Sequence, residues 1–122
     1  MKNINIVVIS GNLTRDAEVR SSSSTEVVKF TVAVNGRQRN PNGEWEDRPN
    51  YIDCTAFGDR FSYLAPNLTN GTKVAVKGEL RWYQWEADGK KHSKVEVVPE
   101  QIEYMSRKEP RQESLYDEDV PF

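Results

Sequence analysis

The chain has 122 residues, 30% of them charged and 36% hydrophobic, which predicts one globular domain with a single core. Its longest apolar run near the start, Ile6–Ile9, is too short to span a membrane and lacks the flanks of a signal peptide, so we expect a cytoplasmic protein. The net charge of −2 lies in residues 107–122, which hold three of the 17 bases and five of the 19 acids. Residues 1–106 are therefore neutral overall, and only the placement of their charges can indicate a nucleic-acid partner.

The first half of the chain predicts strands separated by polar breaks. Residues 4–10 begin by alternating and become continuously apolar, as in a strand packed on both sides. A short extended return over 11–20 and a serine loop over 21–25 follow, and residues 27–34 alternate cleanly. Residues 35–50 contain two Asn-Gly pairs and two prolines, which predict a long loop or the tip of an extended hairpin.

The second half predicts a helix between strands. Residues 51–57 form a third strand, and residues 59–68 are the expected helix, whose last turn Pro66 should end or bend. Residues 73–85 and 92–104 form a hairpin with Asp-Gly at its turn. Five strands with one helix between the third and fourth predict an all-β fold, the five-stranded Greek-key OB-fold barrel.

Alternation along the third strand assigns its two faces, because successive side chains point to opposite sides of a sheet. The core face carries Ile52, Cys54 and Ala56. The opposite face carries two aromatic residues, Tyr51 and Phe57, between polar ones. A solvent face normally has no reason to carry exposed rings.

The strand over 73–85 repeats this pattern. Its apolar face consists of Val74, Val76, Gly78, Leu80 and Trp82. Its other face interleaves cations and rings: Lys73, Lys77, Arg81, Tyr83 and Trp85. A β-bulge after Gly78 would exchange the positions of Trp82 and Trp85, so the face of each indole depends on the register.

Rings and cations on one solvent face suit single-stranded nucleic acid, whose bases stack on aromatic side chains while cations follow the phosphates. The alternative is that the rings pack beneath the 35–50 segment or in a subunit interface. In that segment Arg37 and Arg39 either line the same groove or are solvated, and Trp45 either anchors the loop or adds a stacking contact.

Groups for catalysis or metal binding do not cluster in the sequence. His92 is the single histidine and reads as a solvated edge residue, while Cys54 falls on a core face. One histidine and one cysteine offer neither a zinc ligand set nor a nucleophile with its base. We therefore expect no enzyme, no metal and no cofactor.

Short motifs in a characteristic order resemble the bacterial-type single-stranded DNA-binding protein family. They are GNL (Gly11–Leu13), EVR (Glu18–Arg20), FG (Phe57–Gly58), KGEL (Lys77–Leu80) and the acidic Pro-Phe ending. The resemblance covers residues 1–106 and the last six. It implies an OB-fold, a homotetramer, and a coat on single-stranded DNA during replication, recombination and repair in the bacterial cytoplasm.

The resemblance also assigns residues. The stacking positions of the family fall on Tyr51, Phe57 and Trp85, the rings that the face assignment selects. The face assignment alone predicts the phosphate contacts, which are the stripe Lys73, Lys77 and Arg81, extended by Arg37 and Arg39. The chain departs from the family at Gln38, where many relatives carry Trp, and in its short linker, which suits a phage-encoded or accessory version. A competing interpretation is an OB-fold module for RNA or for replication restart, and another is a protein–protein adaptor.

The last 16 residues, 107–122, form a short linker and an acidic tip. The resemblance implies that the tip docks DNA replication and repair proteins, and it consists of Asp117, Glu118, Asp119, Val120, Pro121 and Phe122. The terminal Phe offers a ring and a carboxylate together, which suits an apolar pocket with a basic rim. The alternative is a tail that only adds solubility.

Overall fold

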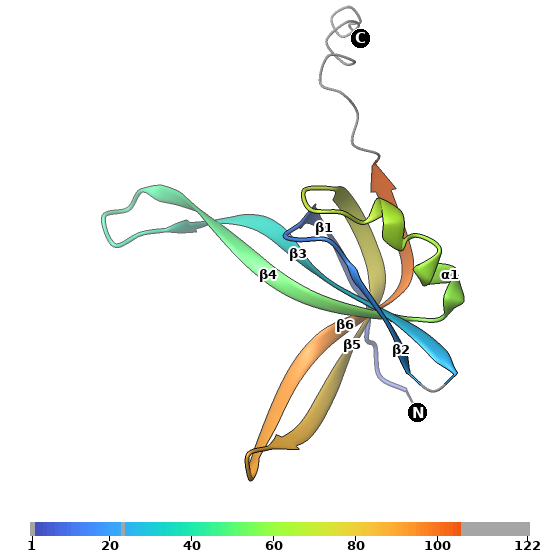
Figure 1. Ribbon diagram of the computed structural model, residues 1–122. Coiled ribbons are helices and arrows are strands. Elements are labelled where there is room, and N and C mark those ends of the chain that lie inside the picture. Colours follow the sequence, from blue (N-terminus) through green and yellow to red (C-terminus); the bar gives the residue numbers. More distant parts are fainter. Residues whose placement is uncertain (1, 23, 106–122) are drawn as a thin grey trace, which may run out of the picture.

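The computed structural model describes residues 2–22 and 24–105, so the linker and the acidic tip, which we expect to dock partner proteins, lie outside the described residues. Strands dominate this part of the chain (Figure 1). In chain order the elements are β1 (Val7–Leu13), β2 (Glu18–Ser22), β3 (Thr25–Arg39), β4 (Trp45–Phe57), α1 (Asp59–Ser62), η1 (Ala65–Asn67), β5 (Lys73–Ala87) and β6 (Lys90–Met105).

Five of these strands close into a barrel, which confirms the predicted all-β OB-fold. The hydrogen-bonded order is β1-β5-β6-β4-β3, and β1 returns to β3 where Leu13 lies opposite Val32. A parallel contact between Cys54 and Val97 joins β4 to β6. The extended return after β1 forms the short strand β2, which pairs with the start of β3. The helical segment lies between β4 and β5, as expected.

Closure at the β1–β3 seam requires a glycine. A Cβ atom on Gly11 would overlap the carbonyl oxygen of Ala33 on β3, so a larger residue would push the two strands apart. The glycine of the GNL motif therefore has a structural reason in this chain, namely close approach of two backbones.

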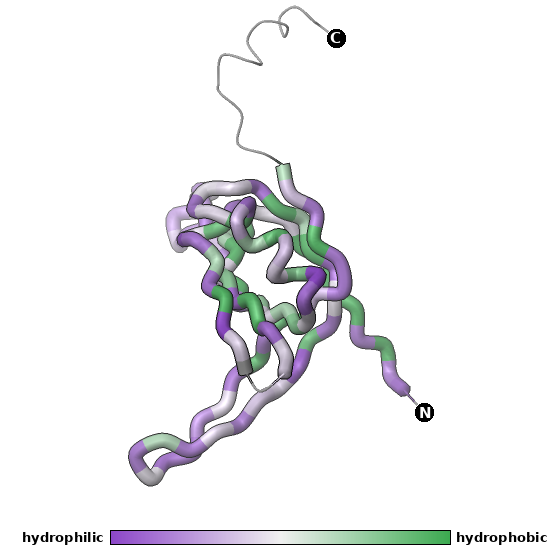
Figure 2. Tube along the Cα trace, turned by 45° about the vertical axis from the view of Figure 1, so that its right-hand side comes forward, coloured by the Kyte–Doolittle hydropathy of each residue, from purple (hydrophilic) through white to green (hydrophobic). Residues whose placement is uncertain are grey.

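The core fills the barrel with the residues that alternation selects. Phe30, Val28 and Val32 from β3 are fully buried, and Figure 2 shows the apolar segments gathered in the barrel. Cys54 is buried among them, and this burial raises the pKa of its thiol to about 12. The expected core role of Cys54 agrees with this position.

The first strand differs from its prediction. Its apolar run suggested packing on both sides, but only alternate residues face the core, and Val8 is 69% exposed. Ile4 and Ile6 are exposed as well. No part of the chain among residues 2–22 and 24–105 covers the outer side of β1, and Val8 is exposed there.

The predicted helix over 59–68 is broken in two. The α-helix α1 ends at Ser62, and a 3-10 turn, η1, contains Pro66. Proline lacks a backbone N–H and disfavours helical geometry in the preceding residue, so it prevents one continuous helix. Phe61 and Leu68 are nevertheless buried and close one end of the core.

Two long hairpins project from the barrel as arms (Figure 1). In the β3–β4 arm, pairing continues to Arg39 opposite Trp45, so residues 35–50 form the extended hairpin and not the long loop. In the β5–β6 arm, Asp88 and Gly89 have φ of 53° and 74°, the left-handed values of a tight two-residue turn. The predicted Asp-Gly turn is confirmed.

The apolar face predicted for β5 is correct only inside the barrel. Val74 and Val76 are buried, but Leu80 and Trp82 are exposed, because by Trp82 the strand has left the barrel and has no core beneath it. The bulge next to Gly78 exists, with the extra residue on β6. The alternation of β5 is therefore not shifted, and the indoles are not exchanged.

A polar network joins three strands on the outside of the barrel. Asp53 on β4 accepts hydrogen bonds from Thr31 on β3 (2.8 Å) and from Lys94 on β6 (2.9 Å). Partial burial alone would raise the pKa of Asp53, but the hydrogen bonds from Lys94 and Thr31 outweigh it and hold the pKa below its ordinary value.

This network predicts an acid-dependent contribution to stability. A carboxyl with a lowered folded pKa stabilises the fold above its unfolded pKa of about 4, and the contribution is lost as the pH falls through the folded pKa. Asp53→Asn should lower the free energy of unfolding by about 0.2–1 kcal/mol at pH 7, since the side chain is 47% exposed. Urea unfolding at pH 7 and pH 3 measures this, and a difference that does not shrink at pH 3 contradicts it.

Candidate nucleic-acid interface

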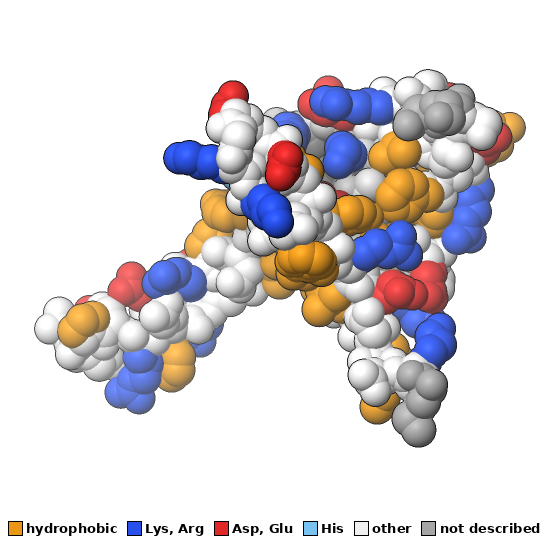
Figure 3. Space-filling view, turned by 90° about the horizontal axis from the view of Figure 1, so that it is seen from below, with side chains coloured by type: hydrophobic (Ala, Val, Ile, Leu, Met, Phe, Trp, Pro, Cys, Tyr) orange, Lys and Arg blue, Asp and Glu red, His pale blue; other side chains and the backbone are white. Residues whose placement is uncertain are grey.

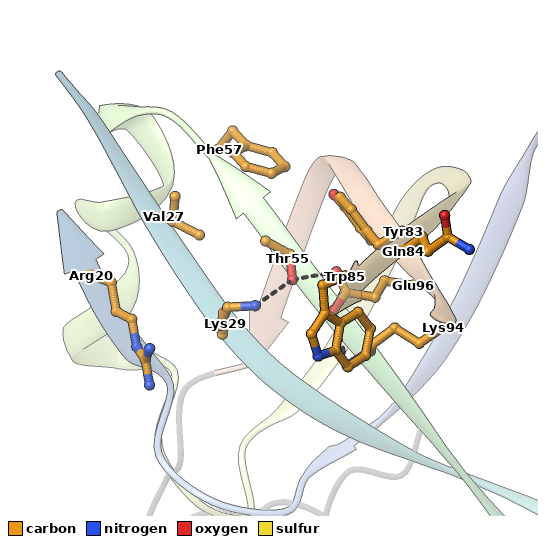
Figure 4. Close-up of a pocket in the computed structure, with 10 residues that line it drawn as sticks. All are labelled: Arg20, Val27, Lys29, Thr55, Phe57, Tyr83, Gln84, Trp85, Lys94 and Glu96. Carbon is orange, nitrogen blue, oxygen red and sulfur yellow. Dashed lines mark hydrogen bonds and ion pairs between the residues drawn. The ribbon is translucent and has the colours of Figure 1, made fainter. Parts of the chain in front are cut away.

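Two of the predicted stacking residues line one cavity. Phe57 ends β4 and Trp85 lies on β5, and both rings border an open cavity of about 570 Å³ between the barrel and the β5–β6 arm (Figure 4). Tyr83 lines it as well. Because the bulge leaves the alternation of β5 intact, Tyr83 and Trp85 share the face that the sequence assigned to them.

The third predicted stacking residue lies apart from this cavity. Tyr51 is 65% exposed on β4, six residues before Phe57, which corresponds to about 20 Å along a strand. It stands where β4 passes into the β3–β4 arm, opposite Ala33. A ligand that touches all three rings must therefore be extended.

Trp85 has a partner that the sequence analysis missed. The His92 ring stacks on its indole with 5.5 Å between centroids and 21° between planes. This contact holds the indole in place and occupies one of its faces. The signal was available, because a two-residue turn at Asp88–Gly89 fixes the register and puts Trp85 opposite His92.

The cavity also has a polar lining that face assignment did not select. Glu96 is 5% exposed and accepts a hydrogen bond from Thr55 (2.7 Å) while pairing with Lys94 (3.0 Å). Lys29 donates to Thr55 at 3.4 Å. The hydrogen bond to Asp53 and the neighbouring Glu96 together raise the pKa of Lys94, so the ammonium stays charged.

The cations predicted on β5 lie outside this cavity. Lys77 lies opposite Val8 of β1 and forms an ion pair with Glu100 at 3.9 Å. Arg81 lies opposite Glu96, and Lys73 lies at the start of the strand. The cations that line the cavity are Arg20, Lys29 and Lys94 instead. The phosphate role of the β5 cations stays a prediction.

The β3–β4 arm carries its own cluster of cations and a ring. The guanidinium carbons of Arg37 and Arg39 lie 5.2 Å and 5.4 Å from the centroid of Trp45. These cation–π contacts hold the indole near the tip while leaving 56% of it exposed. Gln38 on the same arm accepts a hydrogen bond from Arg48.

Trp82 lies on the opposite face of the β5–β6 arm from Trp85. Its cross-strand neighbour is Val95, and both are exposed. Seen from below, hydrophobic side chains gather in the middle of the molecule, with lysine, arginine and acidic side chains around them and along the projecting arm (Figure 3).

This arrangement suits a binding surface. Among residues 2–22 and 24–105 no group of three or more His, Cys, Asp or Glu side chains could hold a metal ion. No helix in the described part of the chain is long and apolar enough to cross a membrane. Open rings beside lysines offer stacking and charge to an extended polyanion with flat groups.

Comparisons with known proteins agree with this geometry. The chain is 36% identical to the single-stranded DNA-binding protein of Aquifex aeolicus, over 97% of this chain and 82% of that one. It is 38% identical to the protein of the same name from Borreliella burgdorferi, over 87% and 72%. The match to the Treponema pallidum protein is 36% identical over 86% of this chain but spans 60% of the relative.

Solved structures share the fold. A deletion mutant of the single-stranded DNA binding protein from Thermus aquaticus superposes with a TM-score of 0.74 at 26% identity, over 84% of this chain and 51% of that one. A Plasmodium falciparum SSB in complex with ssDNA superposes with a TM-score of 0.75 at 16% identity, over 88% and 98%. The model of the Single-strand binding protein family matches residues 4–105. The chain belongs to the single-strand binding protein family.

Proposed function

We propose that this chain binds single-stranded DNA by stacking bases on Phe57, Trp85 and Tyr51. The observation that carries the proposal is the cavity in which two open rings stand beside Lys29 and Lys94. Stacking tolerates any base because each base has a flat π-face, so affinity depends little on sequence. The family to which the chain belongs supports the same function.

In the cell this activity would coat and protect single-stranded DNA during replication, recombination and repair. The protein would act in the bacterial cytoplasm, whether a bacterium or a phage encodes it. The separation of Tyr51 from the cavity favours a strand that runs along β4 toward the β3–β4 arm. There Arg37, Arg39 and Trp45 offer further cations and a ring, in place of the Trp that many relatives carry at position 38.

Titration with oligo(dT) tests this proposal through tryptophan fluorescence. Binding should quench the fluorescence, and Phe57→Ala or Tyr51→Ala should each weaken binding by about 1–3 kcal/mol, because each removes one stacked base. The logarithm of the binding constant should fall with the logarithm of the salt concentration, at a slope of about −0.7 per phosphate neutralised. Lys77→Glu should flatten that slope if β5 contacts the DNA phosphates.

Tyr63→Ala is the matched control, since Tyr63 is an exposed ring in the helical segment and away from the cavity. It should leave the affinity unchanged. An absence of quenching would point to a protein–protein adaptor. Tighter binding of an RNA oligomer than of the matched DNA would point to an RNA-binding module.

We also propose that the protein assembles as a homotetramer through β1. An exposed aliphatic row consists of Ile4, Ile6 and Val8. Beside it, residues 7–10 of β1 pair with β5 along one edge of the strand only. A row of this kind needs cover, and a second copy of β1 offers both matching side chains and a matching edge.

Light scattering at micromolar concentrations tests the assembly. The wild type should have the mass of four chains, and Val8→Asp should shift it to a smaller species, because a charge would then be buried in the interface. Val19→Asp, at an exposed valine on β2, is the control that should keep the mass. A wild-type mass of one chain contradicts the proposal.

The acidic tip is proposed as the docking peptide for DNA replication and repair proteins. Three acids precede Val-Pro-Phe, so charge can steer the peptide while the terminal ring and carboxylate enter a pocket. Pro121 restricts the backbone before Phe122 and lowers the ordering cost of binding.

Deletion of residues 117–122 separates docking from DNA binding. The truncated protein should bind oligo(dT) as tightly as the full chain or slightly more tightly, because acids that repel phosphates are gone. When each protein is used to capture partners from a cell lysate, the truncated protein should no longer capture helicases, nucleases and repair proteins, which mass spectrometry identifies. Phe122→Ala should lose the same partners while keeping the charge, and a purely solubilising tail would leave capture intact.

A further inference from the structure

The cavity beside Phe57 and Trp85 offers polar groups as well as rings for stacking. It is open, has a volume of about 570 Å³, and is lined by Thr55, Lys94 and Glu96 besides the aromatic side chains. Figure 4 shows Thr55 and Glu96 between the two rings. The site therefore has aromatic walls and a polar floor.

The floor has unused hydrogen-bonding capacity. One oxygen of the Glu96 carboxylate accepts from Thr55 and the other pairs with Lys94. A carboxylate accepts about four hydrogen bonds, so each oxygen keeps acceptor capacity beyond its one contact, and Glu96 lines the cavity. Lys94 also offsets the negative charge, so the carboxylate can stand near a DNA strand without strongly repelling it.

Tyr83 also lines the cavity. Its hydroxyl is buried and has no hydrogen-bond partner among the described residues, whereas buried polar groups are normally paired. The hydroxyl can either donate or accept.

These features select among the bases. A carboxylate accepts from an exocyclic amino group, such as N4 of cytosine, whereas thymine and uracil present a carbonyl oxygen at that position. Two negatively polarised oxygens facing each other would repel. The cavity therefore favours a stacked base that carries an amino group over one that carries a carbonyl there.

We propose that one base of the bound strand enters this cavity and donates a hydrogen bond from its amino group to Glu96. The inference rests on the proposed function and adds to it a base preference at one position of the strand. Elsewhere along the strand, stacking stays indifferent to the base.

The test compares (dC)12 with (dU)12, whose bases differ only at the 4-amino or 4-keto group and the adjoining ring nitrogen. Each affinity is measured by fluorescence titration for the wild type and for Glu96→Gln. Any difference in self-stacking between the oligomers is common to both proteins, so it cancels when their affinity ratios are compared.

The preference for (dC)12 over (dU)12 should fall by about fivefold or more in Glu96→Gln. The amide can still accept from Thr55, so we expect the variant to fold, and the ratio of its two affinities is the quantity compared with the wild type. Glu100→Gln is the matched control, because Glu100 is an exposed carboxylate on β6 outside the cavity. It should keep the wild-type ratio.

An unchanged ratio in a folded Glu96→Gln protein would overturn the inference while leaving DNA binding in place. Failure of the wild type to bind either oligomer would instead overturn the proposed function. If Glu96→Gln does not fold, the inference is tested with the wild-type protein alone. A (dU)12 strand with one central dC should then bind more tightly than (dU)12, and equal affinities would overturn the inference.

Discussion

The contact between β4 and β6 is the constraint on which the rest of the structure depends. The two strands run parallel where Cys54 meets Val97, and Thr55 and Glu96 form a hydrogen bond beside this point. The sheet can therefore close only after β6 has crossed the barrel and met β4. This contact also sets where the β5–β6 arm leaves the barrel, and so brings Trp85 to the same cavity as Phe57.

The sequence predicted those features that depend on alternation along one strand. Val28, Phe30 and Val32 point inward, and Tyr51 and Phe57 point outward, because a strand alternates wherever it lies. Alternation does not say where the core ends, and Leu80 and Trp82 were placed inside it for that reason. It also does not say whether a neighbour covers the outer face, which is why β1 appeared to be packed on both sides.

Features that join two strands were harder to predict. His92 meets Trp85 across a tight turn, so the register could have been counted from Asp88–Gly89. Glu96 meets Thr55 across the barrel, at a separation of 41 residues, and no local pattern encodes that pairing. The polar floor of the cavity and its two lysines follow from closure, which becomes visible only in three dimensions.

The two arms have a consequence for how such a protein can change over time. The side chains that keep the barrel folded lie in the closed part of the sheet, whereas Arg37, Arg39 and Trp45 contribute nothing to its core. Insertions, deletions and substitutions in the β3–β4 arm can therefore accumulate without unfolding the protein. A lineage can vary the length and charge of this arm, and with them the stretch of strand it contacts, while the barrel stays under a separate selection for stability.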